Sequence, residues 1–135
     1  MPKTDNVVAG LKKRAQFLYV AQGVKASGRF LSLQMRKRSN VSDPQQKHPQ
    51  NPIRRDEIRF GLTASKKVGN AVCRNLARRR LRAALSSALP LYGIAGNDYV
   101  AIARPQTILA NWLDLTKDIN ILLKKLSLTK NHISE

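Results

Sequence analysis

The sequence predicts an α/β protein of one domain, in which a small sheet packs against helices in the element order α-β-β-α-β-α. Two segments, residues 29–36 and 58–65, alternate apolar and polar side chains, which is typical of strands with one buried face. Two others, 70–89 and 108–126, repeat apolar residues at intervals of three and four, as amphipathic helices do. The chain has 135 residues and is 42% hydrophobic, which suits a single domain with a modest core.

The first half of the chain is predicted to supply one helix and one strand. Residues 1–10 are polar, so we expect them to fray. A short basic helix over residues 11–22 is expected to end at Gly23, because glycine is common just after helix C-termini. The strand over 29–36 follows. Residues 37–57 contain three prolines and almost no apolar side chain, which predicts a flexible insertion or long loop.

The middle of the chain is predicted to form a strand, a turn and a helix. The strand over 58–65 leads to Gly69, which we place in the turn. Asn70 follows and is expected to cap the helix over 70–89 through its side-chain oxygen. Pro90 is expected to end this helix, since proline cannot donate a helical hydrogen bond.

The last part of the chain is predicted to form a short strand and a helix. Residues 99–103 are largely apolar and precede Pro105, which is expected to stop the strand. The helix over 108–126 carries an apolar stripe that includes Trp112, so we assign this tryptophan to the core. Residues 127–135 are expected to form a tail.

The charge of the chain is strongly positive and is concentrated in its centre. It has 25 basic and 8 acidic residues, a formal net charge of +17. No acidic residue occurs between Ile58 and Asn97, and seven of the seventeen residues from Lys66 to Arg82 are basic. Repulsion among these charges lowers the stability of the fold, and a bound polyanion would relieve it. The pattern therefore indicates a polyanionic partner.

The arginines of the central helix fall along one of its edges. At about 100° per residue, small apolar residues share one arc of the helix. These residues are Cys73, Ala77, Leu81, Ala84 and Ala88. Arg74, Arg78 and Arg82 follow one another at intervals of four along the adjoining edge, and Arg79 extends that edge outward. Arg80 lies on the opposite flank. The helix can therefore pack closely on a sheet while its guanidiniums face phosphate oxygens, which they can bind through two hydrogen bonds.

A charge run of this kind can also be a merely solvated helix face. Such faces usually pair opposite charges at i,i+4, whereas here the charged neighbours at that spacing are alike. Each like pair costs a few tenths of a kcal/mol unless an anion intervenes. Lys66 and Lys67 precede the helix N-terminus, whose free N–H groups attract phosphate. Gly69 fits either such a phosphate site or an ordinary turn, and the sequence favours neither interpretation.

One stretch of the chain resembles a known family. The residues RFGLTASKKVGNAV at positions 59–72, followed by Arg74-Asn75 and by arginines at 78, 79 and 82, are similar to the bacterial ribonuclease P protein component. The resemblance is weaker over residues 11–35. It resumes at DYVAIAR, residues 98–104, which is similar to the last strand of the family.

The resemblance implies both a fold and a function. The fold is an α+β sandwich of the ribosomal-protein-S5-like type, with a left-handed crossover around the basic helix, an exception to the usual rule. The function is that of a protein subunit that binds the catalytic RNA subunit of ribonuclease P and the 5′ leader of precursor tRNA, and assists endonucleolytic removal of the leader. The RNA would carry the active site and its Mg²⁺, so we expect no catalytic residue, metal site or other cofactor in the protein alone.

Two sets of residues are then predicted to contact RNA. The set for the RNA subunit comes from the turn and the central helix and comprises Lys66, Lys67, Asn70, Arg74, Asn75, Arg78, Arg79 and Arg82. A cleft for the leader is expected to use Phe17, Phe30 and Arg59, because single-stranded RNA is usually held by aromatic stacking and a basic groove. The family pattern has arginine where this chain has Leu76 and an aromatic where it has Ala21. The leader-stacking surface is therefore expected to be weaker or to use Tyr19 or Phe30 instead.

The sequence shows no catalytic constellation. Asp56 and Glu57 are next to two arginines, which favours ion pairing over hydrolytic chemistry. Cys73 is the single cysteine and lies on the apolar arc, so we interpret it as an inert core thiol. The absence of a signal peptide or a long apolar run favours a cytoplasmic protein with no membrane association. No protein partner is predicted.

Two other functions stay open from the sequence. A ribosomal or other structural RNA-binding protein, without a role in tRNA processing, would have the same composition. A cationic protein of the membrane surface would need large apolar side chains along the central helix, where this chain has mostly alanine.

Overall fold

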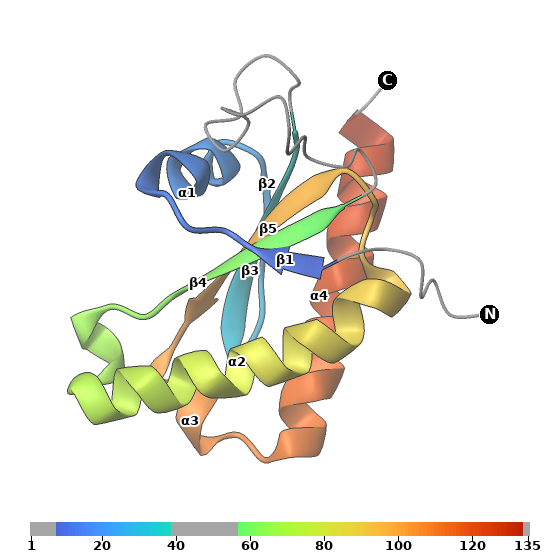
Figure 1. Ribbon diagram of the computed structural model, residues 1–135. Helices are drawn as coiled ribbons and strands as arrows, with labels where there is room; N and C mark the ends of the chain where they lie inside the picture. The colour runs from blue at the N-terminus through green and yellow to red at the C-terminus, as the bar shows by residue number, and fades with distance from the viewer. Residues whose placement is uncertain (1–7, 39–56, 134–135) are drawn as a thin grey trace.

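The computed structural model describes residues 8–38 and 57–133, and it is a five-stranded sheet with helices on both faces (Figure 1). The strands are β1 (Val8–Gly10), β2 (Val24–Ser27), β3 (Leu31–Lys37), β4 (Ile58–Thr63) and β5 (Asn97–Ala103). Their order across the sheet is β1-β4-β5-β3-β2. β1, β4 and β5 run parallel to one another, whereas β3 is antiparallel to both β5 and β2. The predicted α/β class is confirmed.

Two of these strands are absent from the sequence prediction. β1 lies in residues that were expected to fray, and its three residues are too few to show a period. β2 occupies four residues between the first helix and the predicted strand. That strand begins later than predicted because residues 28–30 form the hairpin turn between β2 and β3, which is closed where the N–H of Gly28 donates to the carbonyl of Leu31 at 2.8 Å. Phe30 therefore belongs to this turn and not to a strand.

The helices also differ from the prediction at their ends. They are α1 (Arg14–Ala21), α2 (Ala71–Tyr92), α3 (Pro105–Leu109) and α4 (Trp112–Ile133), with a 3-10 turn η1 (Lys66–Val68) before α2. The predicted final helix is two helices, because Ala110 is extended and interrupts the helical backbone. Trp112 begins α4 and is 47% exposed, so its assignment to the core is wrong. Residues 127–133 continue α4 and do not form a tail.

Pro90 lies inside α2 and does not end it. A proline removes one hydrogen bond to the residue four positions earlier, which here is the exposed Ser86, whose carbonyl water can satisfy. The last turn closes when the N–H of Gly93 donates to the carbonyl of Leu89 at 2.8 Å. The loss of one bond near the C-terminus is therefore tolerated.

Two apolar clusters lie on the two faces of the sheet. The larger one fills the space between the sheet and the helices α2 and α4, and includes Leu33, Tyr99 and Leu122. The small residues predicted for the inner arc of α2 are buried there, although Cys73 is only half-buried. The smaller cluster lies under α1 and is centred on Val20 and Val100. Since α1 has eight residues, it covers only part of that face (Figure 1).

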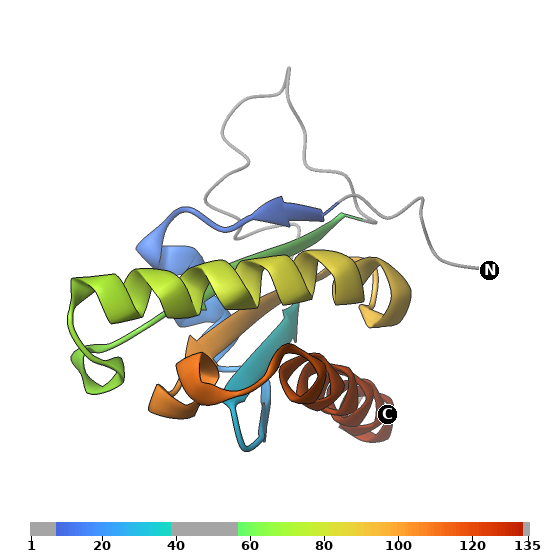
Figure 2. The same cartoon turned by 90° about the horizontal axis from the view of Figure 1, so that it is seen from below.

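The connection from β4 through α2 to β5 is left-handed, as the resemblance implies. Figure 2 shows α2 in front of the two parallel strands, and with both strands pointing upward β5 lies to the left of β4. A right-handed connection would place β5 on the other side. The crossover leaves the arginine-rich part of α2 beside the outer edge of β4.

Candidate nucleic-acid interface

The turn before α2 has the geometry predicted for a helix start. Gly69 has φ +143° and ψ −158°, a backbone conformation that a side chain would strain. Asn70 is the N-cap, because its Oδ1 accepts a hydrogen bond from the N–H of Cys73 at 3.0 Å. In η1, the hydroxyl of Ser65 accepts from the N–H of Lys67 at 3.3 Å. Lys66 and Lys67 are thus exposed directly before the helix.

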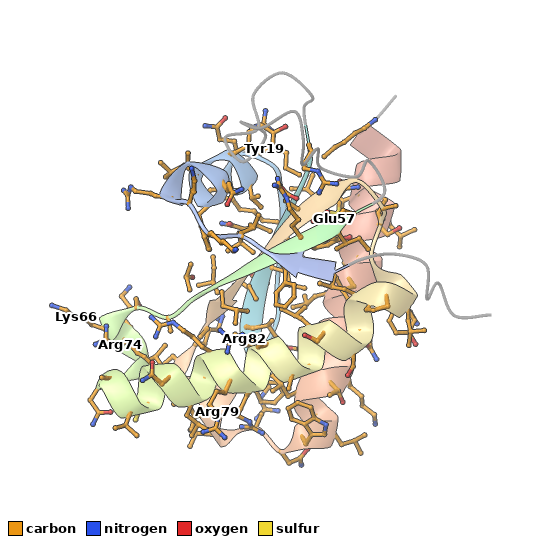
Figure 3. The ribbon with its side chains drawn as sticks, viewed as in Figure 1. Tyr19, Glu57, Lys66, Arg74, Arg79 and Arg82 are labelled. Atoms are coloured by element: carbon orange, nitrogen blue, oxygen red, sulfur yellow. The ribbon has the colours of Figure 1, made fainter. Side chains whose placement is uncertain are left out.

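The arginine edge of α2, which consists of Arg74, Arg78, Arg79 and Arg82, is open to solvent on its outer side. Arg79 and Arg82 are exposed, while Arg74 and Arg78 are half-buried. Within residues 8–38 and 57–133 none of the four forms an ion pair. Lys66 lies near Arg74 at the same end of the helix (Figure 3). The positive charge of this edge is therefore uncompensated by the described part of the chain.

Two of these arginines have informative hydrogen-bond environments. Arg78 donates from Nη1 to Oδ1 of Asn75 at 3.1 Å, so Asn75 orients its neighbour one turn on. The Nε of Arg74 is buried and has no hydrogen-bond partner among the residues that the structure describes. An unsatisfied donor of this kind costs free energy that an external acceptor would recover.

Arg80 has a structural role on the other flank of α2. Its Nη1 donates to the carbonyls of Thr107 at 2.8 Å and Ile108 at 2.7 Å, and its Nη2 donates to the carbonyl of Ala110 at 2.6 Å. These are the carbonyls at the C-terminal end of α3, where a positive charge is favourable. The placement of Arg80 away from the arginine edge is confirmed.

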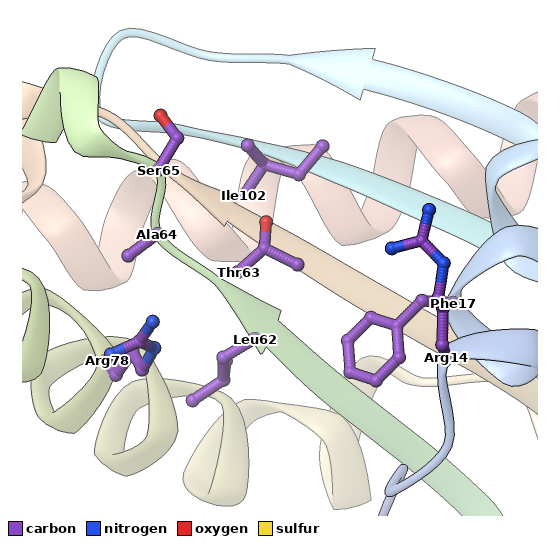
Figure 4. Close-up of a pocket in the computed structure, with 8 residues that line it drawn as sticks. All are labelled: Arg14, Phe17, Leu62, Thr63, Ala64, Ser65, Arg78 and Ile102. Atoms are coloured by element: carbon purple, nitrogen blue, oxygen red, sulfur yellow. The ribbon is translucent and has the colours of Figure 1, made fainter.

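A groove of about 440 Å³ adjoins the arginine edge, at the outer margin of β4 (Figure 4). It is lined by Arg14, Phe17, Leu62, Thr63, Ala64, Ser65, Arg78 and Ile102. Arg14 and Phe17 come from α1, and Arg78 comes from α2, so guanidiniums on two helices flank one apolar floor. We call this surface the β4 groove.

The β4 groove exists because neither β1 nor α1 extends far enough to fill it. β1 pairs with β4 only as far as Phe60, and in the described part of the chain no other strand covers the outer edge of β4 beyond that point. The ring of Phe17 rests on Gly61, where a Cβ atom would lie 2.4 Å from the phenylalanine Cζ. Glycine at this position therefore allows the aromatic ring to lie directly on the sheet.

The structure places the three predicted leader-cleft residues in different environments. Phe17 lines the β4 groove. Phe30 packs against the larger core on the opposite face, and its N–H donates to Asp118 at 3.0 Å. Arg59 is 2% exposed and buried against Asp98. The expectations for Phe30 and Arg59 are therefore wrong. Phe30 lies in a turn on the other side of the sheet, and Arg59 lies in the part of the sheet that other elements cover.

Asp98 neutralises two buried arginines. Its Oδ1 accepts from Nη1 of Arg38 at 2.7 Å and from Nε of Arg59 at 2.9 Å, and its Oδ2 accepts from Nη2 of Arg59 at 2.6 Å. Arg59 and Asp98 are direct partners in the parallel register of β4 and β5. Because this carboxylate already binds Arg38 and Arg59, it does not neutralise the positive charge of the β4 groove.

Sequence reasoning missed several lining residues. Arg14 precedes Phe17 by three positions, so the two share one face of α1, and this spacing was the available signal. Thr63 and Ile102 are partners in the register of two strands, which no local pattern reveals. Tyr19 is not a free substitute for the missing aromatic, because the guanidinium of Arg36 covers its ring at 4.0 Å.

The described residues contain no cluster of three or more metal-ligating side chains. In the same part of the chain, no helix combines the length and the apolar character required to cross a bilayer. Cys73 is half-buried and forms no disulfide within the described residues.

Fold and site together define a small basic α/β protein with an exposed arginine edge on one helix and an adjoining groove. The chain belongs to the ribonuclease P protein family, whose model, described as Ribonuclease P, matches residues 6–127. The sequence resemblance to this family is thereby confirmed.

Curated relatives and solved structures agree with this membership. The chain is 41% identical to the ribonuclease P protein component of Paramagnetospirillum magneticum, over 93% of this chain and 88% of that protein. It is 38% identical to the ribonuclease P protein component of Ruegeria pomeroyi, over 96% of this chain and 99% of that protein. A mutant of the Staphylococcus aureus RNase P protein has a similar fold, with a TM-score of 0.67 at 24% identity, covering 87% of both chains. The Thermotoga maritima RNase P protein also has a similar fold, with a TM-score of 0.63 at 21% identity, covering 84% of this chain and 94% of that chain.

Proposed function

We propose that this chain is the protein subunit of a ribonuclease P ribonucleoprotein, in which it binds the catalytic RNA subunit and the 5′ leader of precursor tRNA. The observation that carries this proposal is the set of guanidiniums along one edge of α2, beside the β4 groove, that form no ion pair within the described residues. Family membership supplies the identity of the RNA. The proposal places the protein in the cytoplasm.

The arginine edge of α2 and the lysines of η1 bind the backbone of the RNA subunit in this proposal. Guanidiniums bind phosphate oxygens through paired hydrogen bonds, and the N-terminal turn of α2 adds the positive end of the helix dipole. Leu76 occupies the third position of the family's Arg-Asn-Arg pattern and is 37% exposed, so it offers an apolar contact there. Asn75 supports the edge by holding Arg78.

The β4 groove binds the leader. A single strand needs an aromatic surface for its bases and cations for its phosphates, and Phe17 with Arg14 and Arg78 provides both. Contacts to phosphates carry little sequence information, so this binding is expected to tolerate many leader sequences.

The reaction itself is assigned to the RNA subunit. Hydrated Mg²⁺ held by RNA can generate the attacking hydroxide and stabilise the leaving oxygen. The protein contributes affinity for substrate and screens the repulsion between two RNA backbones. In a reconstituted assay it should therefore lower the Mg²⁺ concentration needed to cleave precursor tRNA, which a purely structural RNA-binding protein would not do.

A double substitution tests the arginine edge. Arg78→Ala with Arg82→Ala should weaken binding of the RNA subunit and reduce the slope of log K against log salt by about 0.7 to 0.9 for each lost phosphate contact. The matched control is Lys117→Ala with Lys125→Ala, which removes two exposed charges from α4. Equal affinity of both variants at physiological salt would contradict the proposal.

A further inference from the structure

The corner between α3 and α4 exposes three large apolar side chains. Leu109 ends α3 and is 82% exposed, while Trp112 and Leu113 begin α4 and are 47% and 63% exposed. The corner forms because Ala110 is extended and separates the two helices. Single apolar residues are normal on a protein surface, but a group that includes the single tryptophan of the chain indicates a contact surface.

The outer face of α2 connects this corner with the arginine edge. At about 100° per residue, Arg79, Leu76 and Arg80 follow one another around the helix, from the arginine edge to the flank that meets α3. Arg80 donates to the carbonyl of Ala110 at 2.6 Å, close in sequence to Trp112. Figure 1 shows α3 and the start of α4 alongside α2. The corner is therefore continuous with the surface proposed to bind the RNA subunit.

The charge around the corner favours an anionic partner. Arg79 is exposed, Arg80 is half-buried, and neither forms an ion pair within the described residues. The acidic residue nearest in sequence to Trp112 is Asp114, which lies about 200° around α4 from the tryptophan. Its carboxylate is in the first turn of α4, where it stabilises the helix dipole. A second copy of this chain would bring its own positive charge to the corner, so repulsion opposes self-association.

An aromatic ring beside arginines suits an unpaired base of RNA. Proteins bind unpaired nucleotides by stacking the base on an aromatic side chain while cations hold the neighbouring phosphates. At this corner the indole of Trp112 is available for the first role and the guanidinium of Arg79 for the second.

We propose that Trp112 stacks on an unpaired base of the RNA subunit, so that the interface extends from the arginine edge across the outer face of α2 to the α3–α4 corner. This inference rests on the proposed function, because it assumes that the arginine edge binds that RNA. Leu76 replaces the last arginine of the family's Arg-Asn-Arg pattern, and stacking at the corner offsets the loss of that phosphate contact. The affinity contributed by the corner depends little on salt, since stacking releases no counterions.

The emission of Trp112 tests the proposal directly, because no other tryptophan contributes to it. Acrylamide quenching is measured for the natural protein alone, with the RNA subunit, and with inorganic polyphosphate. The RNA subunit should shield the indole and lower the quenching constant. Polyphosphate binds arginines but has no bases, so it should leave the quenching constant unchanged. This experiment needs no variant and therefore does not depend on how a variant folds.

The outcomes of the quenching experiment are distinct. If the RNA subunit binds but leaves the quenching constant unchanged, or if polyphosphate lowers it equally, the stacking contact is overturned and the proposed function stands. If the RNA subunit does not bind at all, the proposed function is overturned as well. Shielding that appears without RNA as the protein concentration rises would mark contact between copies, and would overturn the assignment of the corner to RNA.

Substitutions at the corner separate stacking from charge. Trp112→Ala should weaken binding of the RNA subunit by about fivefold or more, with an unchanged slope of log K against log salt, because a stacked base is lost and no phosphate contact is. Trp112→Phe should recover most of this affinity, whereas Trp112→Leu should not, since leucine has no ring face. The matched control is Leu128→Ala, which truncates an exposed apolar side chain toward the other end of α4 and should bind normally. Equal recovery by phenylalanine and leucine would overturn stacking.

Discussion

Asp98 shows at the scale of one residue how the protein separates structural arginines from those open to solvent. Arg38 and Arg59 converge on its buried carboxylate, whereas the arginines of α2 have no such partner in the described residues. Burying an ion pair gives little net stability, but removing one member leaves an uncompensated charge.

Replacing this carboxylate should therefore destabilise the fold. Asp98→Asn is expected to lower the free energy of unfolding by about 3 kcal/mol or more, because it removes the charge of the buried carboxylate on which two guanidiniums converge. Urea unfolding followed by circular dichroism measures the change. The exposed Asp114 serves as the control, and Asp114→Asn should alter stability by about 0.5 kcal/mol at most. Similar stabilities of the two variants would contradict the structural role of Asp98.

Tyr99 makes the stability of the protein depend on pH in the alkaline range. Burial raises the pKa of Tyr99 from 10.0 to about 12, and the backbone hydrogen bond from Ile94 partly offsets this. The fold therefore favours the protonated phenol. Below pH 10 both folded and unfolded chains hold the proton, whereas between pH 10 and 12 only the folded chain holds it. Stability should fall across this window by about 1.4 kcal/mol for each pH unit.

Comparison with Tyr99→Phe isolates this effect from the titration of lysines, which both proteins share. The substitution loses the hydroxyl that accepts from Ile94, so it should be less stable at neutral pH. The difference in unfolding free energy between the two proteins should then shrink or reverse as the pH rises from 10 to 12. A difference that stays constant with pH would count against the buried neutral phenol.

At the scale of an element, α2 carries solvent-exposed and fold-supporting arginines side by side. Arg79→Ala should leave the free energy of unfolding within about 0.5 kcal/mol, since its side chain is exposed. Arg80→Ala should lower it by about 2 kcal/mol, because three carbonyls at the end of α3 lose a charged donor. Thermal and urea unfolding, together with RNA-binding assays, should separate these neighbours. Equal stability loss in both would show that Arg80 does not hold α3.

The elements that could be predicted from the sequence are those with a long local pattern. The start of α2 was predictable from Asn70 and Gly69, and its inner arc from the spacing of its alanines. β2 could not be predicted, since four residues are too short for a period and the strand depends on pairing with β3. The break between α3 and α4 depends on tertiary contacts with Arg80, which the apolar stripe does not encode.

The candidate site was predictable to a similar extent. The charged edge of α2 follows from helical geometry alone, because its members are close in sequence. The β4 groove is built from α1, α2 and two strands, so only Phe17 and Arg78 among its lining residues had been singled out. The failure of Arg59 has the same origin: strand alternation gives the face of the sheet, but not the position of the helix that covers it.

At the scale of the whole molecule, the net charge of +17 makes salt act in opposite directions on two properties. Added salt screens repulsion within the free protein, so its melting temperature should rise between low ionic strength and about 0.5 M salt. Affinity for RNA should fall over the same range, because the release of counterions on binding is less favourable when the bulk salt concentration is higher. Differential scanning calorimetry and filter binding measure the two trends. A melting temperature that falls with salt would contradict the role assigned to self-repulsion.

The central position of β5 has a consequence for synthesis on the ribosome. β5 joins β4 to β3, yet it is the last strand of the sheet to be translated. Until Ala103 has left the exit tunnel, the nascent polypeptide holds two separate groups of strands, β1 with β4 and β2 with β3. The core therefore closes late and in one cooperative step, after the arginines of α2 have already emerged. An RNA partner can meet these arginines before the domain that presents them is complete.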